Sequence, residues 1–267
     1  MPRAALKFSV AAKDWISTMT SSGWNGYVTR FVDEGSVNEY ARLYDSGSHD
    51  DYVWSLERPV LVEKLRRERE RQGRLRLLDF ACGTGRILHA VEEFADELTG
   101  LDISAQMTQR AAVASQKSTI RTGDVLTDDL LSGPYEAVTI FRFFLNAPED
   151  LRLPILRKIR QHMEPGALLV LNNHGHCPSL RSLVVRVPKP RQQRPNELRH
   201  REIVDLLHTS GFRIARRHGF SMFPSVLHRH LPETALRRAD ALAGSPLLQR
   251  LTRRLMIEQL YFARAVG

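Results

Sequence analysis

The stretch LLDFACGTGRIL, residues 77–88, constrains the fold of this chain more than any other segment. An apolar run of strand type reaches Asp79, Gly83 and Gly85 follow, and a second apolar stretch with helical spacing then begins. Glycine lets a ligand approach the backbone closely, and the start of a helix presents free N–H groups. The pattern therefore predicts a strand, a tight turn and a helix that together bind a nucleotide-like ligand.

An acid follows this turn at the distance that a nucleotide site requires. Asp102 ends the next predicted strand, 19 residues after Gly83. A carboxylate in that place can accept hydrogen bonds from both hydroxyls of a ribose. A dinucleotide-binding dehydrogenase would also need a third glycine where this chain has Leu88, and the turn lacks a lysine of the Walker type. Both features disfavour those two classes of nucleotide site.

The order of strand and helix recurs along the chain. We expect strands over residues 75–80, 97–102, 118–124, 135–141, 167–171, 212–218 and 258–266. Helices are expected between them, for example around Leu151, Ile155 and Ile159 and over residues 202–211. Because strands that alternate with helices form parallel sheets with right-handed crossovers, the predicted class is α/β with a mostly parallel sheet.

The predicted core is preceded and interrupted by other segments. Residues 1–72 are expected to form a mainly helical N-terminal extension or lid, in which the helix over residues 58–73 is closed by Gly73. Residues 73–267 form the predicted core domain. Two basic insertions interrupt it, over residues 176–197 and residues 220–255, and the second is expected to contain two helices.

The charge of the chain is unevenly distributed. The net charge is +9, and residues 176–267 contain 17 Lys and Arg but only 6 Asp and Glu. A local basic surface predicts an anionic partner such as phosphate, nucleic acid or membrane headgroups. The two cysteines, Cys82 and Cys177, predict neither a disulfide framework nor a metal site. Without a secretory h-region or a spanning apolar run, the expected location is the cytoplasm.

The stretch DFACGTGRIL resembles the glycine-rich motif of class I S-adenosylmethionine-dependent methyltransferases. The resemblance continues in order through LTGLDIS, RTGDVLT, YEAVTIFRFFLNAPED, HMEPGALLVLNNH and TSGFRIARRHGF, and so covers residues 74–220 and the terminal strand. The branch is similar to the ubiquinone and menaquinone biosynthesis methyltransferases, which act on small molecules. The resemblance implies a Rossmann-like fold, with a seven-stranded sheet covered by helices on both faces, and S-adenosyl-L-methionine as cofactor.

The resemblance also implies a set of cofactor contacts. Asp102 matches the ribose-binding acid and Asp124 the residue near the adenine, while Ala81 stands where the family usually has its first glycine. The expected cofactor-binding residues are Tyr44, Asp79, Ala81, Gly83, Gly85, Asp102, Ile103, Asp124, Val125 and Phe141. Tyr44 belongs to EYARLYD, which resembles the lid of this branch. There Tyr40 and Tyr44, four residues apart, would share one helical face, and an aromatic ring could cover a sulfonium.

Candidate catalytic residues follow the fourth and fifth predicted strands, because ligands of open α/β sheets bind beyond the carboxyl ends of the strands. His174 and His176 have the pKa of a general base near neutrality, although both also suit a polar loop. Arg142 is expected to bind an anionic substrate, or alternatively to pair with Glu136 or Glu149. Asn146 is a candidate for orienting the acceptor, or else it only starts the following helix.

The basic last third leaves several partners open. Leu247, Leu248, Leu251 and Leu255 fall on one predicted helical stripe, which predicts either packing within the domain or peripheral membrane contact through residues 231–255. We expect a methyltransferase acting on an oxygen or nitrogen atom of a small-molecule or lipid-like, anionic acceptor. RNA methylation and a non-catalytic scaffold are the alternatives. The basic region lacks the interleaved aromatic residues of RNA-binding modules, which disfavours nucleic acid, and the oligomeric state stays open.

Overall fold

The computed structural model describes residues 34–174, 179–180, 198–228, 230–245 and 247–267. Its centre is a seven-stranded sheet in the order β3-β2-β1-β4-β5-β7-β6. Strands β1 to β5 pair in parallel, and β7 pairs antiparallel with both β5 and β6. The predicted mostly parallel, Rossmann-like sheet is therefore confirmed, and β4 separates β1 from β5.

The strands lie where the apolar runs of the sequence predict them. They are β1 Arg76–Phe80, β2 Glu97–Asp102, β3 Ser118–Thr122, β4 Tyr135–Ile140, β5 Met163–His174, β6 Phe212–Phe220 and β7 Glu258–Ala265. Strand β4 is buried at every residue, as expected for a central strand covered on both faces. Strand β5 extends further at both ends than the apolar run alone predicts.

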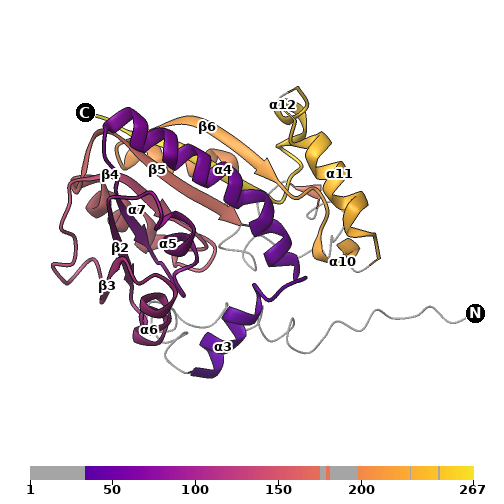
Figure 1. Ribbon diagram of the computed structural model, residues 1–267. Coiled ribbons are helices and arrows are strands. Elements are labelled where there is room, and N and C mark those ends of the chain that lie inside the picture. The colour runs from indigo at the N-terminus through magenta and orange to yellow at the C-terminus, as the bar shows by residue number, and fades with distance from the viewer. Residues whose placement is uncertain (1–33, 175–178, 181–197, 229, 246) are drawn as a thin grey trace, which may run out of the picture.

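Helices cover both faces of the sheet (Figure 1). They are α3 Glu34–Arg42, α4 His49–Gln72, α5 Arg86–Val91, α6 Ala105–Ala114, α7 Glu149–Gln161, α9 His200–Thr209, α10 Ser225–His228, α11 Glu233–Ala243 and α12 Gln249–Thr252. One apolar core contains residues of α7 and α9, such as Ile155 and Ile203. The other contains residues of α4 and α5, such as Leu65 and Leu88. Helix α4 has 24 residues but too few apolar side chains to cross a membrane. No other described helix is long and apolar enough to cross one.

Helix α4 begins nine residues before the predicted start at residue 58. The Ser48 side chain caps it by accepting a hydrogen bond from the Asp51 N–H at 3.0 Å, and Gly73 ends it in a left-handed conformation. Pro59 therefore lies inside the helix and not at its first turn. The prediction failed because the buried contacts of Tyr52 and Val53 stabilise the earlier turns. Whether a domain boundary falls at residue 72 stays a prediction.

The segment between β6 and β7 contains three short helices, α10 to α12, and not the two that the sequence predicts. The stripe from Leu247 to Leu255 is also not one helix, because α12 comprises only Gln249–Thr252. Helix α11 packs on the start of α4, where the Tyr52 hydroxyl donates to Asp240 Oδ2 at 2.6 Å. The other predicted insertion, residues 176–197, lies almost entirely outside the described residues, with His176 and Cys177.

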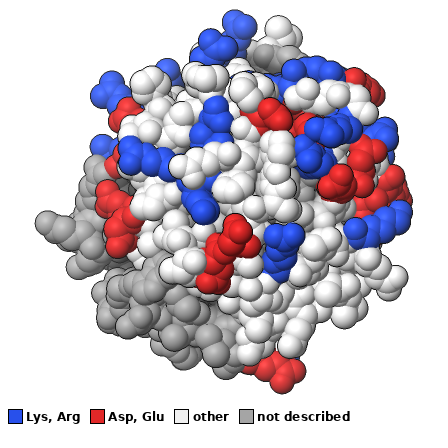
Figure 2. Space-filling view, turned by 90° about the vertical axis from the view of Figure 1, so that its left-hand side faces the viewer, with Lys and Arg blue, Asp and Glu red and all other residues white. Residues whose placement is uncertain are grey.

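Charges of both signs are mixed on the face shown in Figure 2, which lies on the left of Figure 1. At the amino ends of the strands, ion pairs join Arg69 to Asp96 at 2.9 Å and Arg74 to Glu136 at 2.9 Å. The described residues on this face therefore form no single-signed patch for a nucleic acid.

Candidate active site

The glycine turn between β1 and α5 has the backbone conformation that its sequence requires. Gly83 (φ 54°) and Gly85 (φ 85°) are both left-handed. A Cβ on Gly85 would lie 2.9 Å from Cα of Ala111 in α6, so glycine is also needed for the packing of these two helices. Ala81, which replaces the family's first glycine, adopts φ 57° despite its side chain. Alanine therefore preserves the turn at some cost in backbone strain.

Asp102 ties the end of β2 to this turn. Its Oδ2 accepts a hydrogen bond from the Gly83 N–H at 2.8 Å, and its Oδ1 accepts one from the Ser104 N–H at 3.0 Å. Burial raises the pKa of Asp102, although these N–H groups act in the opposite direction. A carboxylate has about four acceptor positions, so these contacts do not use all of them and leave capacity for a ligand hydroxyl. The predicted position of the ribose-binding acid is thus supported by its geometry.

A small hollow opens between the turn and the end of β4, and Ala81 and Phe141 line it together with Asp79 and Arg86. Asp79 Oδ1 accepts a hydrogen bond from Thr139 Oγ1 at 2.6 Å, whereas Asp79 Oδ2 is buried without a partner. Burial raises the pKa of Asp79 to about 7. Nη1 of Arg86 is also buried without a partner. The acid and the base that line this hollow thus each have one buried polar atom without a hydrogen-bond partner.

These residues fit the cofactor that the resemblance implies. The methionine end of S-adenosylmethionine carries an ammonium and a carboxylate, which complement Asp79 and Arg86, and its ribose complements Asp102. The adenine would lie further along the sheet edge. Of the predicted cofactor contacts, Ile103 follows β2, and Asp124 and Val125, which the resemblance places near the adenine, follow β3. Asp124 Oδ1 accepts from the Leu126 N–H at 2.9 Å, and Val125 is buried.

The predicted lid differs from the structure in one respect. Helix α3 ends at Arg42, so Tyr40 and Tyr44 do not share a helical face. Their rings nevertheless meet edge to face, with centroids 5.9 Å apart. Tyr40 packs beside Gly83, and the ring of Tyr44 faces the guanidinium groups of Arg86 at 4.3 Å and Arg142 at 5.5 Å. The ring of Tyr44 therefore already contacts two arginine side chains. The sequence predicts instead an aromatic ring that is available to cover a sulfonium.

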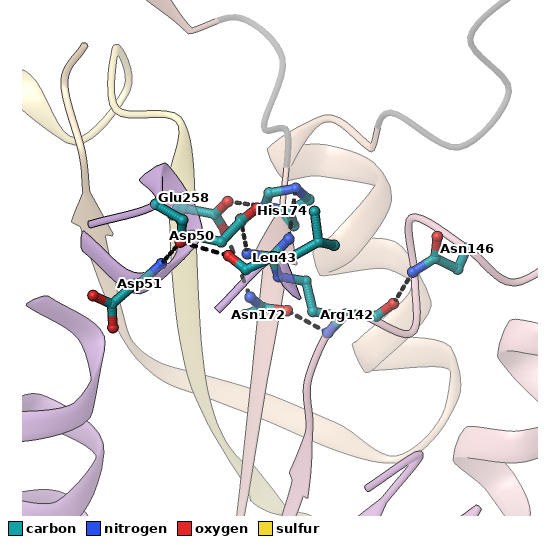
Figure 3. A network of polar contacts seen from close by, with 9 residues as sticks. Leu43, Asp50, Asp51, Arg142, Asn146, Asn172, His174 and Glu258 are labelled. Atoms are coloured by element: carbon teal, nitrogen blue, oxygen red, sulfur yellow. Dashed lines mark hydrogen bonds and ion pairs between the residues drawn. The ribbon is translucent and has the colours of Figure 1, made fainter. Parts of the chain in front are cut away.

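Arg142, directly after β4, is the centre of a buried polar network (Figure 3). Its left-handed backbone (φ 58°) is held by a hydrogen bond from its N–H to Asn172 Oδ1 at 2.8 Å. Its guanidinium pairs with Asp50 of α4 at 2.5 Å and lies 3.0 Å from Nε2 of His174. The predicted pairing with Glu136 or Glu149 is therefore wrong. Although burial opposes it, Tyr44 and Asp50 hold the pKa of Arg142 above its ordinary value.

His174 lies at the carboxyl end of β5, in register with Glu258 of β7. Nδ1–H of His174 donates to the carboxylate of Glu258, which is fully buried, and this bond directs Nε2 toward Arg142 (Figure 3). Because an arginine is only a donor, Nε2 must be the unprotonated nitrogen. The imidazole therefore has the tautomer of a general base, and Arg142 occupies its basic nitrogen.

The other candidate residues are placed less directly. The side-chain amide of Asn146 donates to the carbonyl oxygen of Arg142, so it supports the turn that carries this arginine. His176 lies outside the described residues. Sequence analysis missed Asp50, Glu258 and Arg86. Only Arg86 carried a local signal, because it directly follows the glycine turn. Within the described stretches of the chain, the structure brings together no group of three or more metal-ligating side chains.

Comparison with known proteins agrees with this geometry. Residues 48–216 match the family model described as a methyltransferase domain. The chain is 30% identical over 148 residues to dTDP-4-amino-2,3,4,6-tetradeoxy-D-glucose N,N-dimethyltransferase of Saccharopolyspora spinosa, which covers 53% of this chain and 57% of that one. It is 25% identical to ubiquinone biosynthesis O-methyltransferase of Xanthomonas campestris, over 41% of this chain and 47% of that one. The chain thus spans about half the length of the curated relatives it matches.

The fold is similar to that of solved methyltransferases. Magnesium protoporphyrin IX methyltransferase of Synechocystis, solved with S-adenosylhomocysteine bound, superposes with a TM-score of 0.60 at 16% sequence identity. The match covers 89% of this chain and 98% of that protein. At this identity the likeness concerns the fold.

Proposed function

The chain belongs to the methyltransferase-domain family, and on this premise we propose that it transfers a methyl group from S-adenosylmethionine to an oxygen or nitrogen atom of a small-molecule or lipid-like acceptor. The observation that carries the proposal is that Asp79 and Arg86, two opposite charges that line one hollow beside the glycine turn, each have a buried polar atom without a hydrogen-bond partner. Asp102 lies at the end of the neighbouring strand, where it would take the ribose.

The residues at the carboxyl edge of the sheet would perform the transfer mainly by positioning. When bound, the cofactor supplies an electrophilic methyl group on a sulfonium. Asp79, Arg86 and Asp102 would hold its polar groups, and the buried ring of Phe141 would exclude water from the hollow. Holding an acceptor in line with the methyl group accounts for much of the acceleration in such reactions.

His174 would accept the proton that the acceptor oxygen or nitrogen loses. Glu258 would stabilise the resulting imidazolium, because its carboxylate contacts Nδ1. Nε2 must first lose its contact with Arg142. An anionic group on the acceptor would draw the guanidinium away and at the same time become bound by it. Arg142 is therefore proposed as the substrate-binding residue, and Asn146 as the support of its turn. His176 remains a second proposed base.

The nature of the acceptor is proposed from two observations. The named relatives methylate a nitrogen in one case and an oxygen in the other, and one is named for a nucleotide-linked sugar, which is anionic. The segment 231–255 also exposes large apolar side chains, with Leu247 88% and Leu251 75% exposed. Leucines beside arginines favour peripheral contact with the anionic inner face of the membrane, which would suit a lipid-like acceptor.

The proposal is tested by calorimetric titration of the protein with S-adenosylmethionine. Asp102→Asn is close in size but neutral, and its single oxygen can accept from only one of the Gly83 and Ser104 N–H groups. Hydrogen bonds to a charged group contribute about 1.5–3 kcal/mol each, so losing two corresponds to at least a hundredfold weaker binding. Asp129→Asn, which changes an exposed acid, is the matched control and should bind as the wild type does.

Either of two outcomes would contradict this function. If the wild type binds neither S-adenosylmethionine nor S-adenosylhomocysteine, the enzyme proposal fails, and a scaffold function has to be considered. If Asp102→Asn and Asp129→Asn bind equally well, the cofactor lies elsewhere. Where binding is confirmed, transfer of a labelled methyl group to acceptors with oxygen or nitrogen nucleophiles identifies the substrate, beginning with anionic lipids.

A further inference from the structure

A second group of basic side chains lies where β6 and β7 meet helix α9. Arg217 of β6 pairs in register with Tyr261 of β7, and its guanidinium lies close enough to the Tyr261 hydroxyl to interact with it. His200, the first residue of α9, stacks on the ring of Tyr261 with centroids 5.7 Å apart. Its Nδ1 lies 3.1 Å from the same hydroxyl. Arg253 and Arg254, which follow α12, act electrostatically on both His200 and Arg217.

Arg217 differs from the other buried arginines of the described chain in its partners. It is only 7% exposed, and its Nε has no hydrogen-bond partner, which is also true of Nε of Arg142 and Arg152. However, the buried Arg142 pairs with Asp50, and Arg152 lies close enough to Glu149 to be influenced by its charge. By contrast, the groups whose charge acts most on Arg217 are Tyr261, Arg253 and Arg254, and none of these is a carboxylate. A buried guanidinium without a carboxylate is costly, which suggests that another anion completes its environment.

The chain places these arginines together through close backbone packing. A Cβ on Gly219 would lie 3.1 Å from Cα of Arg253, so the glycine lets the returning segment approach β6 closely. No acid occurs between Asp240 and Glu258, whereas that stretch contains three arginines. Nε of Arg253 is buried without a hydrogen-bond partner, like that of Arg217, while Arg254 is exposed. The group is therefore reachable from solvent on the side of Arg254.

The electrostatics agree with a site of strongly positive potential. Burial, together with the charges of Arg217, Arg253 and Arg254, lowers the pKa of His200 to about 4. Burial also lowers the pKa of Arg217 from its ordinary value. Both groups are therefore partly removed from water, and the charges that act most on His200 are all positive. Bringing in an anion would reverse these shifts, so binding of an anion would raise the pKa of His200.

We propose that Arg217, Arg253, Arg254, His200 and Tyr261 form a binding site for a phosphate group. The planar fork of arginine matches phosphate oxygens, and several guanidinium groups match a group with more than one negative charge. The Tyr261 hydroxyl would complete the site as a hydrogen-bond donor. Arg217 and Tyr261 lie on the face of the sheet that α9 covers, opposite the face that carries α4 and its contact with Arg142. The site is therefore separate from the proposed methyl-transfer centre and does not rest on that function.

The phosphate has two possible sources. A soluble phosphate ester would bind from solution, while a phospholipid headgroup would bind with its membrane. The second source is compatible with Leu251 and Leu255, which flank the two arginines in the chain and are 75% and 40% exposed. The chemistry of recognition is the same in both cases, so the two are distinguished by experiment.

The first arm of the experiment measures binding of inorganic phosphate, by calorimetry and by the histidine signals in NMR spectra, with chloride at matched ionic strength. We expect the wild type to bind and the signal of His200 to titrate at higher pH when phosphate is present. Arg254→Met changes an exposed side chain, so it should fold and bind at least tenfold more weakly. Arg217→Met should lose binding, and Arg217→Lys should retain part of it.

Arg216→Met is the matched control. Arg216 is exposed and adjacent to Arg217 on β6, and the substitution removes the same single positive charge. It should bind phosphate as the wild type does. If Arg216→Met and Arg254→Met weaken phosphate binding equally, only the net charge matters, and the proposed site is wrong. Binding by chloride and phosphate alike, or no binding by the wild type to phosphate or to vesicles, would also overturn it.

The second arm measures sedimentation with vesicles of phosphatidylglycerol, compared with vesicles of phosphatidylcholine. Binding to the anionic vesicles that Arg254→Met and Arg217→Met both weaken identifies a lipid headgroup as the source. Binding of inorganic phosphate without binding of vesicles identifies a soluble phosphate ester. Vesicle binding that neither substitution changes, in a protein that does not bind inorganic phosphate, overturns the proposal.

Discussion

Nδ1 of His174 donates a hydrogen bond to the carboxylate of Glu258, across the antiparallel pair of β5 and β7. The two residues are 84 positions apart in the chain. Because the carboxylate fixes the proton on Nδ1, Nε2 is left as the nitrogen that can accept a proton. The relationship between these two side chains therefore decides whether His174 can act as a base.

Replacing Glu258 by glutamine should change the tautomer of His174. The amide is similar in shape but neutral, so it favours the proton on Nδ1 less strongly, and the other tautomer should become populated where the side chain of Arg142 moves away from Nε2. Nitrogen NMR of the imidazole measures this without any acceptor. Asp50→Asn, which alters the partner of Arg142 on the opposite side of the network, is the control and should leave Nδ1 protonated. An unchanged tautomer in Glu258→Gln would contradict the role of Glu258.

Once an acceptor is known, His174→Gln should slow methyl transfer by about 10²–10⁴, the usual contribution of a general base. Binding of S-adenosylmethionine should stay unchanged, because His174 does not line the cofactor hollow. Single-turnover rates and calorimetry measure the two effects separately. A His174→Gln enzyme with a normal rate would mean that positioning alone suffices for the reaction.

The sequence predicted what depends on local patterns. The strands were predicted because short apolar runs such as Leu168–Leu171 are long enough for a buried strand and are bounded by turns. Asp79 and Asp102 were predicted because their places are fixed by the glycine turn and by the strand that follows it. Tyr44 was misplaced because the end of α3, only two residues earlier, carries no strong sequence signal.

The polar network could not be predicted, because its contacts join distant segments. Asp50 and Arg142 are 92 residues apart, and nothing near either residue identifies the other. The register of β5 and β7 brings Glu258 to His174, and a shift of one residue would place Glu258 on the opposite face of the sheet. The extent of α4 was also decided by tertiary contacts, which keep Pro59 inside a helix.

The affinity for S-adenosylmethionine should rise with pH through neutrality. Burial raises the pKa of Asp79 to about 7, so the free protein holds a proton there that the ligand ammonium must displace. Calorimetry in buffers of different ionisation enthalpy should detect release of a proton on binding at pH 6 and little release at pH 8.5. Asp79→Asn should bind more weakly at every pH and release no proton. Proton release that persists in this variant would assign it to another group.

The same carboxyl should make stability depend on pH. Asp79 has a higher pKa in the folded state than its ordinary value of 3.8, so the folded state binds the extra proton between about pH 4 and pH 7. The free energy of unfolding should therefore fall as the pH rises through this window, by at most about 4 kcal/mol. Urea unfolding at several pH values measures this. In Asp79→Asn the free energy of unfolding should no longer fall over this pH range. An identical pH dependence in the wild type and in Asp79→Asn would contradict the role of Asp79.

Gly85→Ala should destabilise the protein more than an ordinary glycine substitution. The left-handed φ of 85° costs about 1–2 kcal/mol for an L-residue, and the new Cβ would meet Ala111 at 2.9 Å, which adds about 1–3 kcal/mol of overpacking. Gly166→Ala is the matched control, because its φ is 78° and its Cβ would meet no atom within 4 Å. The difference in free energy of unfolding between Gly85→Ala and Gly166→Ala measures the contribution of the close packing of α5 and α6. If both variants lose the same stability, the structure can relax around the new Cβ at residue 85 without cost.

Tyr52→Phe should loosen the attachment of α11 to α4. The Tyr52 hydroxyl donates to Asp240 Oδ2 at 2.6 Å, and the Met222 N–H donates to Asp240 Oδ1 at 2.7 Å. Because Asp240 is only 6% exposed, loss of one donor leaves a buried carboxylate poorly solvated, at a cost of about 1.5–3 kcal/mol. Urea unfolding measures this loss, and hydrogen exchange of the α11 amides should become faster.

Tyr135→Phe provides the comparison for this last substitution. Tyr135 is equally buried, but its hydroxyl interacts with the backbone and hydroxyl of Ser132 at 3.2 and 3.3 Å, and neither group is charged. Its loss should cost only about 0.5–1.5 kcal/mol and leave exchange in α11 unchanged. If both substitutions cost the same and neither changes exchange in α11, the Tyr52–Asp240 bond does not hold the β6–β7 segment in place. The position of α11 would then depend on the apolar packing around Leu236 and on the remaining polar contacts, such as that of Arg237 with Ser55.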